Sequence, residues 1–340
     1  MQDITTQHLS APRLLADIGG TNARFALEFE THKFVAVAVL SCNAYADLHE
    51  AIADYLQSAA VQSVWSGPIR HAAIALANPV DGDVVSMTNN HWKFSISALK
   101  QSLQLQTLVV VNDFTALALA LPHLHPSERI QVGNGQAQPD RVIGLIGPGT
   151  GLGVSGIIPS GEKWLPLSSE GGHVSFSPAN KTELALLEVI WNEFPHVSAE
   201  RLISGMGLEL LYRTIQTLRG VTNIESLSAA EISAQALDGS CPLCVESVQH
   251  FCAMLGTVAG NLALTLGATG GVYIGGGIVP KLGELFFASE FRQRFESKGR
   301  FADYLSQIPT YLITAEYPAF LGVSALLTER LSAVEMNENA

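Results

Sequence analysis

The sequence predicts a chain of two α/β domains. Short continuous apolar runs, of the kind that parallel sheets bury on both faces, occur in both halves of the chain. The same order of elements, a strand pair joined by a glycine turn and followed by a further strand and a helix, occurs twice. With 340 residues and 47% hydrophobic content, the chain can bury a core in each half. We therefore expect two similar domains that face one another across a cleft.

The first half combines a hairpin with short apolar runs and a helical segment. The elements expected there are strands at Arg13 to Ile18, Ala23 to Phe29, Lys33 to Leu40, His71 to Ala77 and Leu108 to Val111, and a helix at Ala46 to Ala59. The stretch Pro122 to Asp140 is rich in Pro, Gly, Asn and Gln, which indicates a boundary or a surface excursion.

The second half repeats this pattern and adds longer helices. The elements expected there are strands at Arg141 to Gly147 and Gly271 to Gly277 and helices at Lys181 to Glu193, Ser204 to Leu218 and Val245 to Leu266. The segment Ser247 to Pro280 contains no Asp, Glu, Lys or Arg, but Asn261 and several glycines interrupt it. A buried helix followed by a buried strand explains this segment better than a membrane span.

The charge balance excludes several classes of partner. Lys and Arg total 19 against 31 Asp and Glu, a formal net charge of -12, and there is no basic run. Nucleic acid and anionic membranes would be repelled.

The four cysteines are too few for a disulfide framework, and Cys241-Pro-Leu-Cys244 has no second Cys or His pair to complete a zinc site, which favours ordinary reduced thiols. The N-terminus lacks the pattern of a signal peptide, so we expect a cytoplasmic protein.

Two glycine turns suggest anion binding. In Asp17 to Arg24, Gly19 and Gly20 allow close approach of backbone N–H groups, and Thr21 and Asn22 add side-chain donors. A hairpin tip needs no ligand to explain its glycines, but Asp17 beside it costs stability unless a divalent cation or water offsets its charge. The turn Gly147 to Gly153 follows the first strand of the second half in the same relative place. Two matched turns could hold the two ends of a polyphosphate.

The sequence supports two interpretations of Asp113 equally. After the strand Leu108 to Val111, it could be the N-cap of the helix that starts at Phe114. Alternatively, Asn112 or water caps the helix, and Asp113 stands at the carboxyl end of a sheet strand, where α/β proteins bind ligands.

Further polar groups stand among glycines in the second half. In Ser168 to Phe176, Glu170 and His173 flank Gly171 and Gly172, so that both side chains could converge on a small polar ligand. A metal site would need more ligands than this, and we assign no residue as a protein ligand of a metal. Glu200 also reads as part of an ordinary helix start, and the loop Met87 to Trp92 suits sugar hydroxyls as well as any turn.

Several motifs, in order, resemble the bacterial glucokinase family, of the superfamily that includes hexokinases and actin. They are DIGGTNARFAL, MTNNHWKFSI, VVVNDFTALA, GPGTGLGV, EGGHVSF, HVSAERLISGMGL and GGVYIGGGIVP, and they extend from about Arg13 to beyond Phe320. The chain lacks the cysteine-rich zinc motif of a related kinase and repressor group, which favours the zinc-free branch. Asn78, Asn90 and His91 stand where fine hexose selectivity could differ.

The resemblance implies a two-domain actin-like (ribonuclease H-like) fold with an interdomain cleft. We expect a small α/β domain of residues 1–122 and 315–340 and a large α/β domain of residues 123–314. The implied activity is ATP-dependent phosphorylation of glucose at its C6 hydroxyl, with Mg²⁺ on the phosphates, in a homodimer. Asp113 would be the catalytic base. The implied glucose ligands are Asn89, Asn112, Asp113, Glu170, His173 and Glu200. The implied nucleotide contacts are Asp17, Gly19, Gly20, Thr21, Asn22, Gly149, Thr150, Gly151, Gly275, Gly276 and Gly277.

Three alternatives remain at this stage. The nearest is a kinase of another hexose. A second is a sugar-responsive regulator without catalysis, although no helix-turn-helix segment precedes the first glycine turn. A third is a phosphatase or ATPase of the same superfamily, for which the sugar-directed polar residues would be unexplained.

Overall fold

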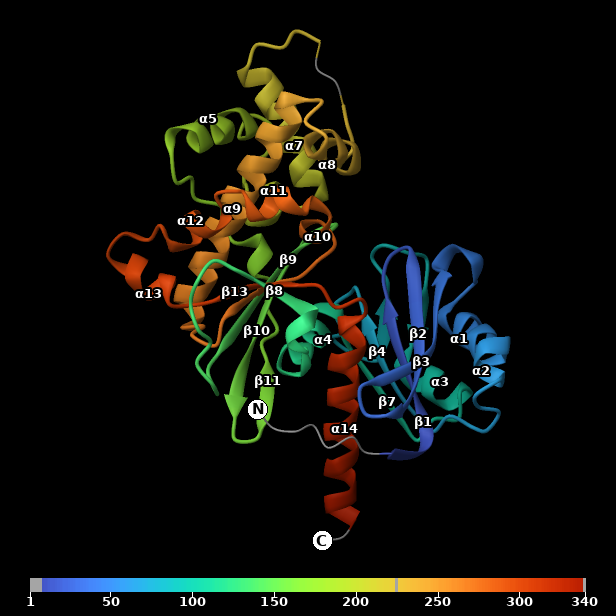
Figure 1. The fold of residues 1–340 in the computed structure, drawn as a ribbon. Helices are drawn as coiled ribbons and strands as arrows, with labels where there is room; N and C mark the ends of the chain where they lie inside the picture. The colour runs from blue at the N-terminus through green and yellow to red at the C-terminus, as the bar shows by residue number, and fades with distance from the viewer. Residues whose placement is uncertain (1–7, 224–225, 339–340) are drawn as a thin grey trace. The chain divides into compact units, whose positions relative to one another are not determined.

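The computed structural model describes residues 8–223 and 226–338, which divide into two units. Unit 1 comprises Met1–Leu124 and Glu316–Ala340, and unit 2 comprises His125–Ala315. Figure 1 shows helices and strands in both.

Unit 1 is a mixed sheet of five strands with helices on both faces. Its strands are β1 (His8–Ile18), β2 (Asn22–Glu30), β3 (Lys33–Ser41), β4 (His71–Leu76) and β7 (Thr107–Asn112), in the order β3-β2-β1-β4-β7, and β5 (Val84–Ser86) and β6 (Lys93–Ser95) form a separate pair. Its helices are α1 (Leu48–Gln57), α2 (Ala59–Gln62), α3 (Ile96–Ser102), α4 (Asp113–Ala120) and α14 (Pro318–Glu338).

Unit 2 has a sheet of six strands and most of the helices. Its strands are β8 (Arg129–Val132), β9 (Ile143–Pro148), β10 (Leu152–Ser160), β11 (Lys163–Pro166), β12 (Val272–Ile274) and β13 (Thr310–Ile313), in the order β11-β10-β9-β12-β13-β8. Its helices are α5 (Lys181–Ile190), α6 (Ala199–Leu202), α7 (Gly205–Leu218), α8 (Ala229–Leu237), α9 (Pro242–Leu266), α10 (Val279–Leu282), α11 (Glu284–Phe287), α12 (Phe291–Glu296) and α13 (Ala302–Ser306), and the 3-10 turn η4 spans Gly171–His173.

The two sheets share one topology. In unit 1, β1 pairs antiparallel with β2 and parallel with β4, and β4 pairs parallel with β7. In unit 2, β9 pairs antiparallel with β10 and parallel with β12, and β12 pairs parallel with β13. The duplication that the sequence indicated is therefore confirmed: the first glycine turn joins β1 to β2, and the second joins β9 to β10.

The alternation of side chains along β1 determines which face of the unit 1 sheet carries Asp17. Successive side chains of a strand point to opposite faces, so Asp17 shares its face with Leu15. Leu15 belongs to the buried cluster that includes Ala116 of α4 and Phe320 of α14. These two helices pack side by side (Figure 1), and a side chain on Gly322 would overlap the backbone of Ala116. The face that carries Asp17 is therefore the face that α4 covers.

The expected strands and helices are all present, with boundaries that shift by a few residues. Two details differ from the sequence analysis. The strand β7 lies at an edge of its sheet and its residues are only half-buried, whereas the apolar run had suggested burial on both faces. The stretch Pro122 to Asp140 contains the division between the two units, but it also contains β8, which pairs with β13. Its strand of four residues is too short and too polar to stand out from turn residues.

Candidate active site

The first glycine turn joins β1 to β2. The pair Ile18 and Ala23 closes the hairpin, and the Gly19 N–H donates to the Asn22 carbonyl at 2.9 Å. Among the described residues, no acceptor is found for the N–H groups of Gly20 and Thr21. Two adjacent N–H groups at such a turn are suited to an anion.

Asp17, at the end of β1, is paired with an arginine. The Arg24 Nη1 donates to its Oδ2 at 3.0 Å. Burial raises the pKa of the Asp17 carboxyl, and Arg24 only partly opposes this effect. The sequence analysis considered a cation or water as the compensation for Asp17, whereas the structure supplies Arg24 from the facing strand.

Asn112, not Asp113, is the N-cap of α4. Its Oδ1 accepts from the N–H groups of Phe114 at 2.9 Å and Thr115 at 3.2 Å. Its Nδ2 donates to Asp113 Oδ1 at 3.1 Å and to the Asn78 carbonyl at 3.4 Å. Both polar atoms of Asn112 already have protein partners, so its main observed role is to order the start of α4 and the Asp113 carboxyl.

Asp113 is the first residue of α4 and its side chain remains partly exposed. Its Oδ1 also accepts from the Phe114 N–H at 2.8 Å. Burial, followed by the nearby charge of Asp17, raises the pKa of Asp113 to about 6, although hydrogen bonds from Phe114, its own N–H and Asn112 act in the opposite direction. A carboxylate with a pKa near neutrality can accept a proton at physiological pH.

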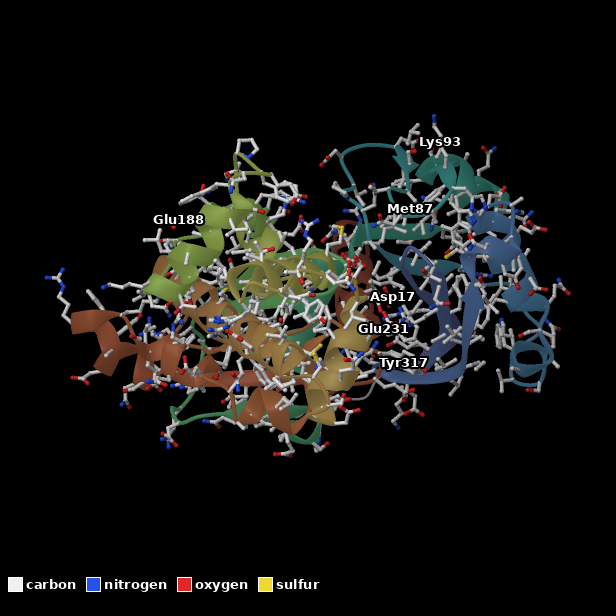
Figure 2. All side chains as sticks on the ribbon, turned by 90° about the horizontal axis from the view of Figure 1, so that it is seen from above. Asp17, Met87, Lys93, Glu188, Glu231 and Tyr317 are labelled. Atoms are coloured by element: carbon white, nitrogen blue, oxygen red, sulfur yellow. The ribbon has the colours of Figure 1, made fainter. Side chains whose placement is uncertain are left out.

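The loop Met87 to Trp92 packs against the first glycine turn. A side chain on Gly20 would come within 2.8 Å of the Asn89 Cβ, and Asn90 Nδ2 donates to the Gly19 carbonyl at 3.2 Å. Figure 2 marks Asp17 and Met87 among the side chains of this unit. Asn89 therefore lies beside the turn, and Asn90 anchors the loop to it.

In unit 2, the Glu200 side chain contacts the glycine turn between β9 and β10. Ser198 caps α6, and the Glu200 Oε2 accepts from the Leu152 N–H at 2.8 Å. Leu152 directly follows Gly151, and a side chain on Gly151 would overlap the Glu200 carboxylate. The ambiguous residue of the sequence analysis thus starts a helix and also contacts the turn.

His173 joins the two acidic residues. Its Nδ1 lies 3.7 Å from Glu200 Oε1 and its Nε2 lies 3.9 Å from Glu170 Oε2. The side chains of His173 and Glu170 are 60% and 80% exposed, so this cluster faces solvent. The glycines of η4 are needed for packing, because a side chain on Gly172 would overlap the Leu152 carbonyl. The three predicted residues are therefore brought together in unit 2.

The other glycine turns of unit 2 lie against each other. The Gly149 N–H donates to the Gly151 carbonyl at 2.8 Å, and the Ile278 N–H reaches the Pro148 carbonyl at 3.4 Å. Gly276 has φ of +78°, and a side chain there would overlap Pro148. No acceptor within the described ranges is found for the N–H groups of Thr150, Gly151, Gly276 and Gly277. The residues thus form a donor-rich surface that fits a polyphosphate.

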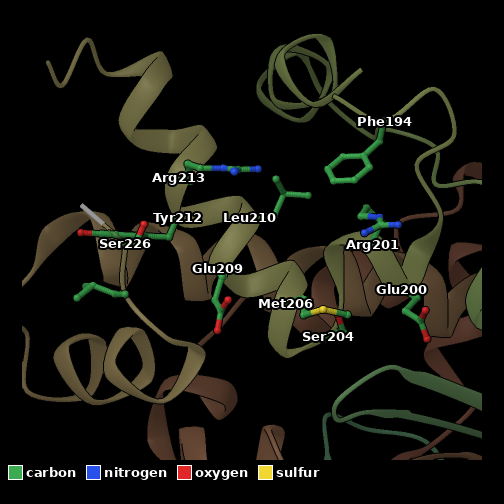
Figure 3. Close-up of a pocket in the computed structure, with 11 residues that line it drawn as sticks. Phe194, Glu200, Arg201, Ser204, Met206, Glu209, Leu210, Tyr212, Arg213 and Ser226 are labelled. Atoms are coloured by element: carbon green, nitrogen blue, oxygen red, sulfur yellow. The ribbon is translucent and has the colours of Figure 1, made fainter. Parts of the chain in front are cut away.

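A cavity of about 360 Å³ adjoins this cluster in unit 2 (Figure 3). Its lining includes Glu200 of α6, Ser204 and Met206 at the start of α7, and Tyr212 and Arg213 farther along α7. The Arg201 guanidinium lies 4.2 Å from the centroid of the Phe194 ring on its border. Glu200 therefore borders both the turn and the cavity.

The described residues include no group of three or more His, Cys, Asp or Glu side chains that could hold a metal ion. Mg²⁺ bound to nucleotide phosphates does not need such a group, because it commonly takes one or two carboxylates, phosphate oxygens and water. Asp17 and Asp113 are carboxylates of the required type.

Of the helices in the described part of the chain, none is long and apolar enough to span a bilayer.

Comparison with known proteins identifies the family. The family model described as Glucokinase matches residues 14–330. The chain belongs to the glucokinase family. The resemblance seen in the motifs is therefore confirmed.

Relatives of two lengths match the chain. The bifunctional protein glk of Paraburkholderia xenovorans (strain LB400) is 54% identical over 329 residues, which are 96% of this chain and 50% of that protein. The chain thus spans about half the length of these curated relatives. The glucokinase of Chromobacterium violaceum is 52% identical over 321 residues, which are 94% of this chain and 90% of the relative.

A solved structure supports the fold class. The crystal structure of a glucokinase from an Antarctic psychrotroph has a TM-score of 0.84 and 37% identity, and the match covers 94% of this chain and 99% of that one. Together with the duplicated sheet topology, this confirms the predicted actin-like α/β fold class for a member of the glucokinase family.

Three contributors to the site were missed or undervalued in the sequence. Arg24 appeared only as the end of the DIGGTNAR motif, Asn90 only as a variable position, and the Leu152 N–H not at all. For Arg24, the signal was available, because a residue seven positions after Asp17 in a tight hairpin is its cross-strand neighbour. The contact between Leu152 and Glu200 joins residues 48 positions apart, and no local pattern indicates it.

Proposed function

We propose that the protein is an ATP-dependent glucokinase, which transfers the γ-phosphoryl group of ATP to the C6 hydroxyl of glucose. The single observation that carries this proposal is the Asp113 carboxyl. It stands at the end of a sheet strand, it is not the helix cap, and its pKa is raised to about 6. Membership in the glucokinase family makes glucose and ATP the first reactants to test.

Asp113 would act as the general base. As the C6 hydroxyl attacks phosphorus, a carboxylate within hydrogen-bond distance can accept the hydroxyl proton. Asn112 would orient this carboxylate through the 3.1 Å hydrogen bond to Oδ1. A loose phosphoryl-transfer transition state depends mainly on positioning and charge neutralisation, so Asp113 is one contribution among several.

Glu170, His173 and Glu200 would bind glucose hydroxyls. The two carboxylates accept hydrogen bonds only, whereas the imidazole can donate from one ring nitrogen and accept at the other. A hexose with an inverted or missing hydroxyl would leave one of these groups unpaired, at a cost of about 1 to 3 kcal/mol. Asn89 and Asn112 stay in the proposed sugar-binding set, with Asn112 acting chiefly on Asp113.

The glycine turns would bind ATP. The free N–H groups around Gly20 and Thr21 in unit 1 and around Thr150, Gly151, Gly276 and Gly277 in unit 2 would donate to phosphate oxygens. Asp17, Gly19, Asn22, Gly149 and Gly275 complete the proposed set by shaping these turns. Mg²⁺, when bound with the nucleotide, would supply positive charge, with Asp17 as the carboxylate available to its water ligands.

The activity is tested with purified protein, ATP, MgCl₂ and a panel of hexoses. We expect glucose 6-phosphate as the product, identified by phosphorus NMR, and a lower kcat/KM for fructose, mannose and glucosamine. Formation of ADP without a sugar phosphate would instead indicate an ATPase. Preference for another hexose would keep the kinase chemistry and reject glucose as the substrate. Glucose binding with no turnover would indicate a regulator.

We further propose that the protein acts in the cytoplasm as a homodimer, as the family resemblance implies. Light scattering of the purified protein tests the second part. A dimer would have twice the 36.2 kDa mass of the chain. A mass equal to one chain at micromolar concentration would reject the dimer.

A further inference from the structure

The motif Cys241-Pro-Leu-Cys244 opens the long helix α9 of unit 2. Cys241 is the N-cap, and its sulfur accepts from the Cys244 N–H at 3.3 Å. Pro242 occupies the first turn, where its missing N–H is not needed. The two cysteines therefore lie on a single helical turn, with Cys241 directed back over the backbone of Cys244.

The Cys241 sulfur contacts the backbone of Cys244, and the Cys244 sulfur lies near Gln235. The Cys244 Sγ donates to Gln235 Oε1 at 3.9 Å, and both cysteines are free thiols. In the described part of the chain, neither cysteine belongs to a group of three or more His, Cys, Asp or Glu side chains that could hold a metal ion. The two thiols stand three residues apart at the start of one helix, so a disulfide between them would not join separate elements of the fold.

The two thiols are chemically unequal. Cys241 is partly exposed, whereas Cys244 is buried. Burial alone would raise the pKa of Cys241, but hydrogen bonds from the Cys244 thiol and N–H, the Leu243 N–H and the Tyr212 hydroxyl outweigh burial and lower it. Burial and the neighbouring Cys241 raise the pKa of Cys244 to about 12. An accessible thiol of lowered pKa followed by a buried thiol is the arrangement of an attacking and a resolving cysteine.

We propose that Cys241 and Cys244 are a reversible redox pair that closes to an intramolecular disulfide when a small-molecule disulfide is supplied. The Cys241 thiolate attacks one sulfur of glutathione disulfide and releases one glutathione thiolate. Cys244 then gives up its proton and attacks the Cys241 sulfur, and the second glutathione thiolate leaves. The protein loses two hydrogens, and one glutathione disulfide becomes two glutathione molecules.

Tyr212 connects the cysteine pair to the cavity beside Glu200. Its hydroxyl interacts with both cysteines, and the same side chain lines the cavity that Glu200 borders. Tyr212 belongs to α7, whose first residue, Gly205, donates its N–H to the Gly149 carbonyl at 2.9 Å. Oxidation would change the sulfur partner of Tyr212, and Tyr212 lies on the helix that starts against the glycine turn.

The test uses the full chain, titrated with glutathione at fixed total concentration and decreasing reduced fraction. After alkylation and digestion, peptide mass spectrometry counts the thiols at each position. We expect Cys241 and Cys244 to be lost together, with a mass decrease of about 2 Da for the linked peptide. This loss should occur at a glutathione disulfide concentration at least tenfold below the one that modifies Cys252, which is buried in the same helix.

Three variants and one rate complete the test. The substitution Cys244→Ser should trap glutathione on Cys241, Cys241→Ser should abolish both products, and Cys252→Ala should change neither. Since a variant can fail to fold, the wild-type chain is also alkylated with iodoacetamide at pH 7, where Cys241 should react at least tenfold faster than Cys252. Equal alkylation rates, or four intact thiols in oxidising glutathione, would overturn the proposal.

Discussion

Replacing Gly151 with alanine perturbs the contact between the second glycine turn and Glu200. The new methyl group would overlap the Glu200 carboxylate, and the backbone at Gly151 is outside the left-handed region, so the only obstacle is this side chain. Glu200 can rotate away, because the overlapping atom is the end of a flexible side chain. The Gly151→Ala variant should therefore fold and lose the 2.8 Å hydrogen bond between the Leu152 N–H and Glu200.

The size of the kinetic effect follows from the hydrogen bond that Glu200 would make to glucose. A hydrogen bond to a charged group contributes about 1.5 to 3 kcal/mol. If Glu200 binds a glucose hydroxyl, a displaced carboxylate should lower kcat/KM for glucose by about 10-fold to 100-fold. We expect most of this loss as a higher KM for glucose, because Glu200 is assigned to sugar binding and not to proton transfer. The free energy of unfolding should fall by about 1.5 kcal/mol, the lower end of this range, because Glu200 is partly exposed and water can solvate the displaced carboxylate.

Gly149→Ala is the matched control in the same turn. A side chain at Gly149 meets no atom within 4 Å, so Glu200 stays in place. The assay measures initial rates against glucose at saturating ATP for both variants, with chemical denaturation to check folding. An unchanged glucose KM in Gly151→Ala, or an equal change in Gly149→Ala, would refute the link between the turn and sugar binding.

Two further variants and a pH profile of the wild type test the unit 1 residues. Asp113→Asn should lower kcat by about 10²-fold to 10⁴-fold with glucose binding retained, and calorimetry together with initial rates measures both; a variant that keeps a tenth of wild-type kcat excludes Asp113 as the base. The same variant should be more stable than wild type by about 1 kcal/mol at pH 7.5 and equally stable at pH 4, a figure already reduced for the partial exposure of Asp113. The reason is that folding raises the pKa of Asp113 from 3.8 to about 6, so the carboxylate lowers the free energy of unfolding of the wild type as the pH rises through this range. Chemical denaturation at both pH values measures the difference. Wild-type kcat should fall as the pH drops through about 6, and a flat profile down to pH 5 contradicts Asp113 as the titrating group. Gly20→Ala should raise the KM for ATP more than the KM for glucose, since the methyl group would come within 2.8 Å of Asn89 and displace the turn; an unchanged ATP KM rejects the phosphate role.

Local patterns in the sequence predicted most of the fold. Strands such as β4 and β9 are continuous apolar runs, and α7 and α9 are long helices with recognisable starts, so their positions depend on neighbouring residues alone. The duplicated order of elements could be read because each glycine turn follows a strand directly. The short strand β8 and the edge position of β7 depend on pairing with distant segments, and the sequence does not show such pairing.

The candidate site was predicted to a different extent in each unit. The sequence identified Asp113 as a candidate, but it did not decide between a ligand-binding carboxylate and a helix N-cap. Only the structure shows that Asn112 accepts the hydrogen bonds from the Phe114 and Thr115 N–H groups. Arg24 changes the interpretation of Asp17, which is paired across the hairpin. The approach of Glu200 to Leu152 depends on the packing of α6 beside β10, and residue spacing carries no information about it.

The most direct test of the account is a crystal structure of the protein with glucose and a non-hydrolysable ATP analogue with MgCl₂. The quantity to measure is the distance from the Asp113 carboxylate oxygens to the C6 hydroxyl of the sugar. The account predicts a hydrogen bond of about 2.6 to 3.2 Å, with the hydroxyl directed at the γ-phosphorus. A bound glucose whose C6 hydroxyl contacts another residue, with Asp113 bonded only to the α4 backbone, would contradict it.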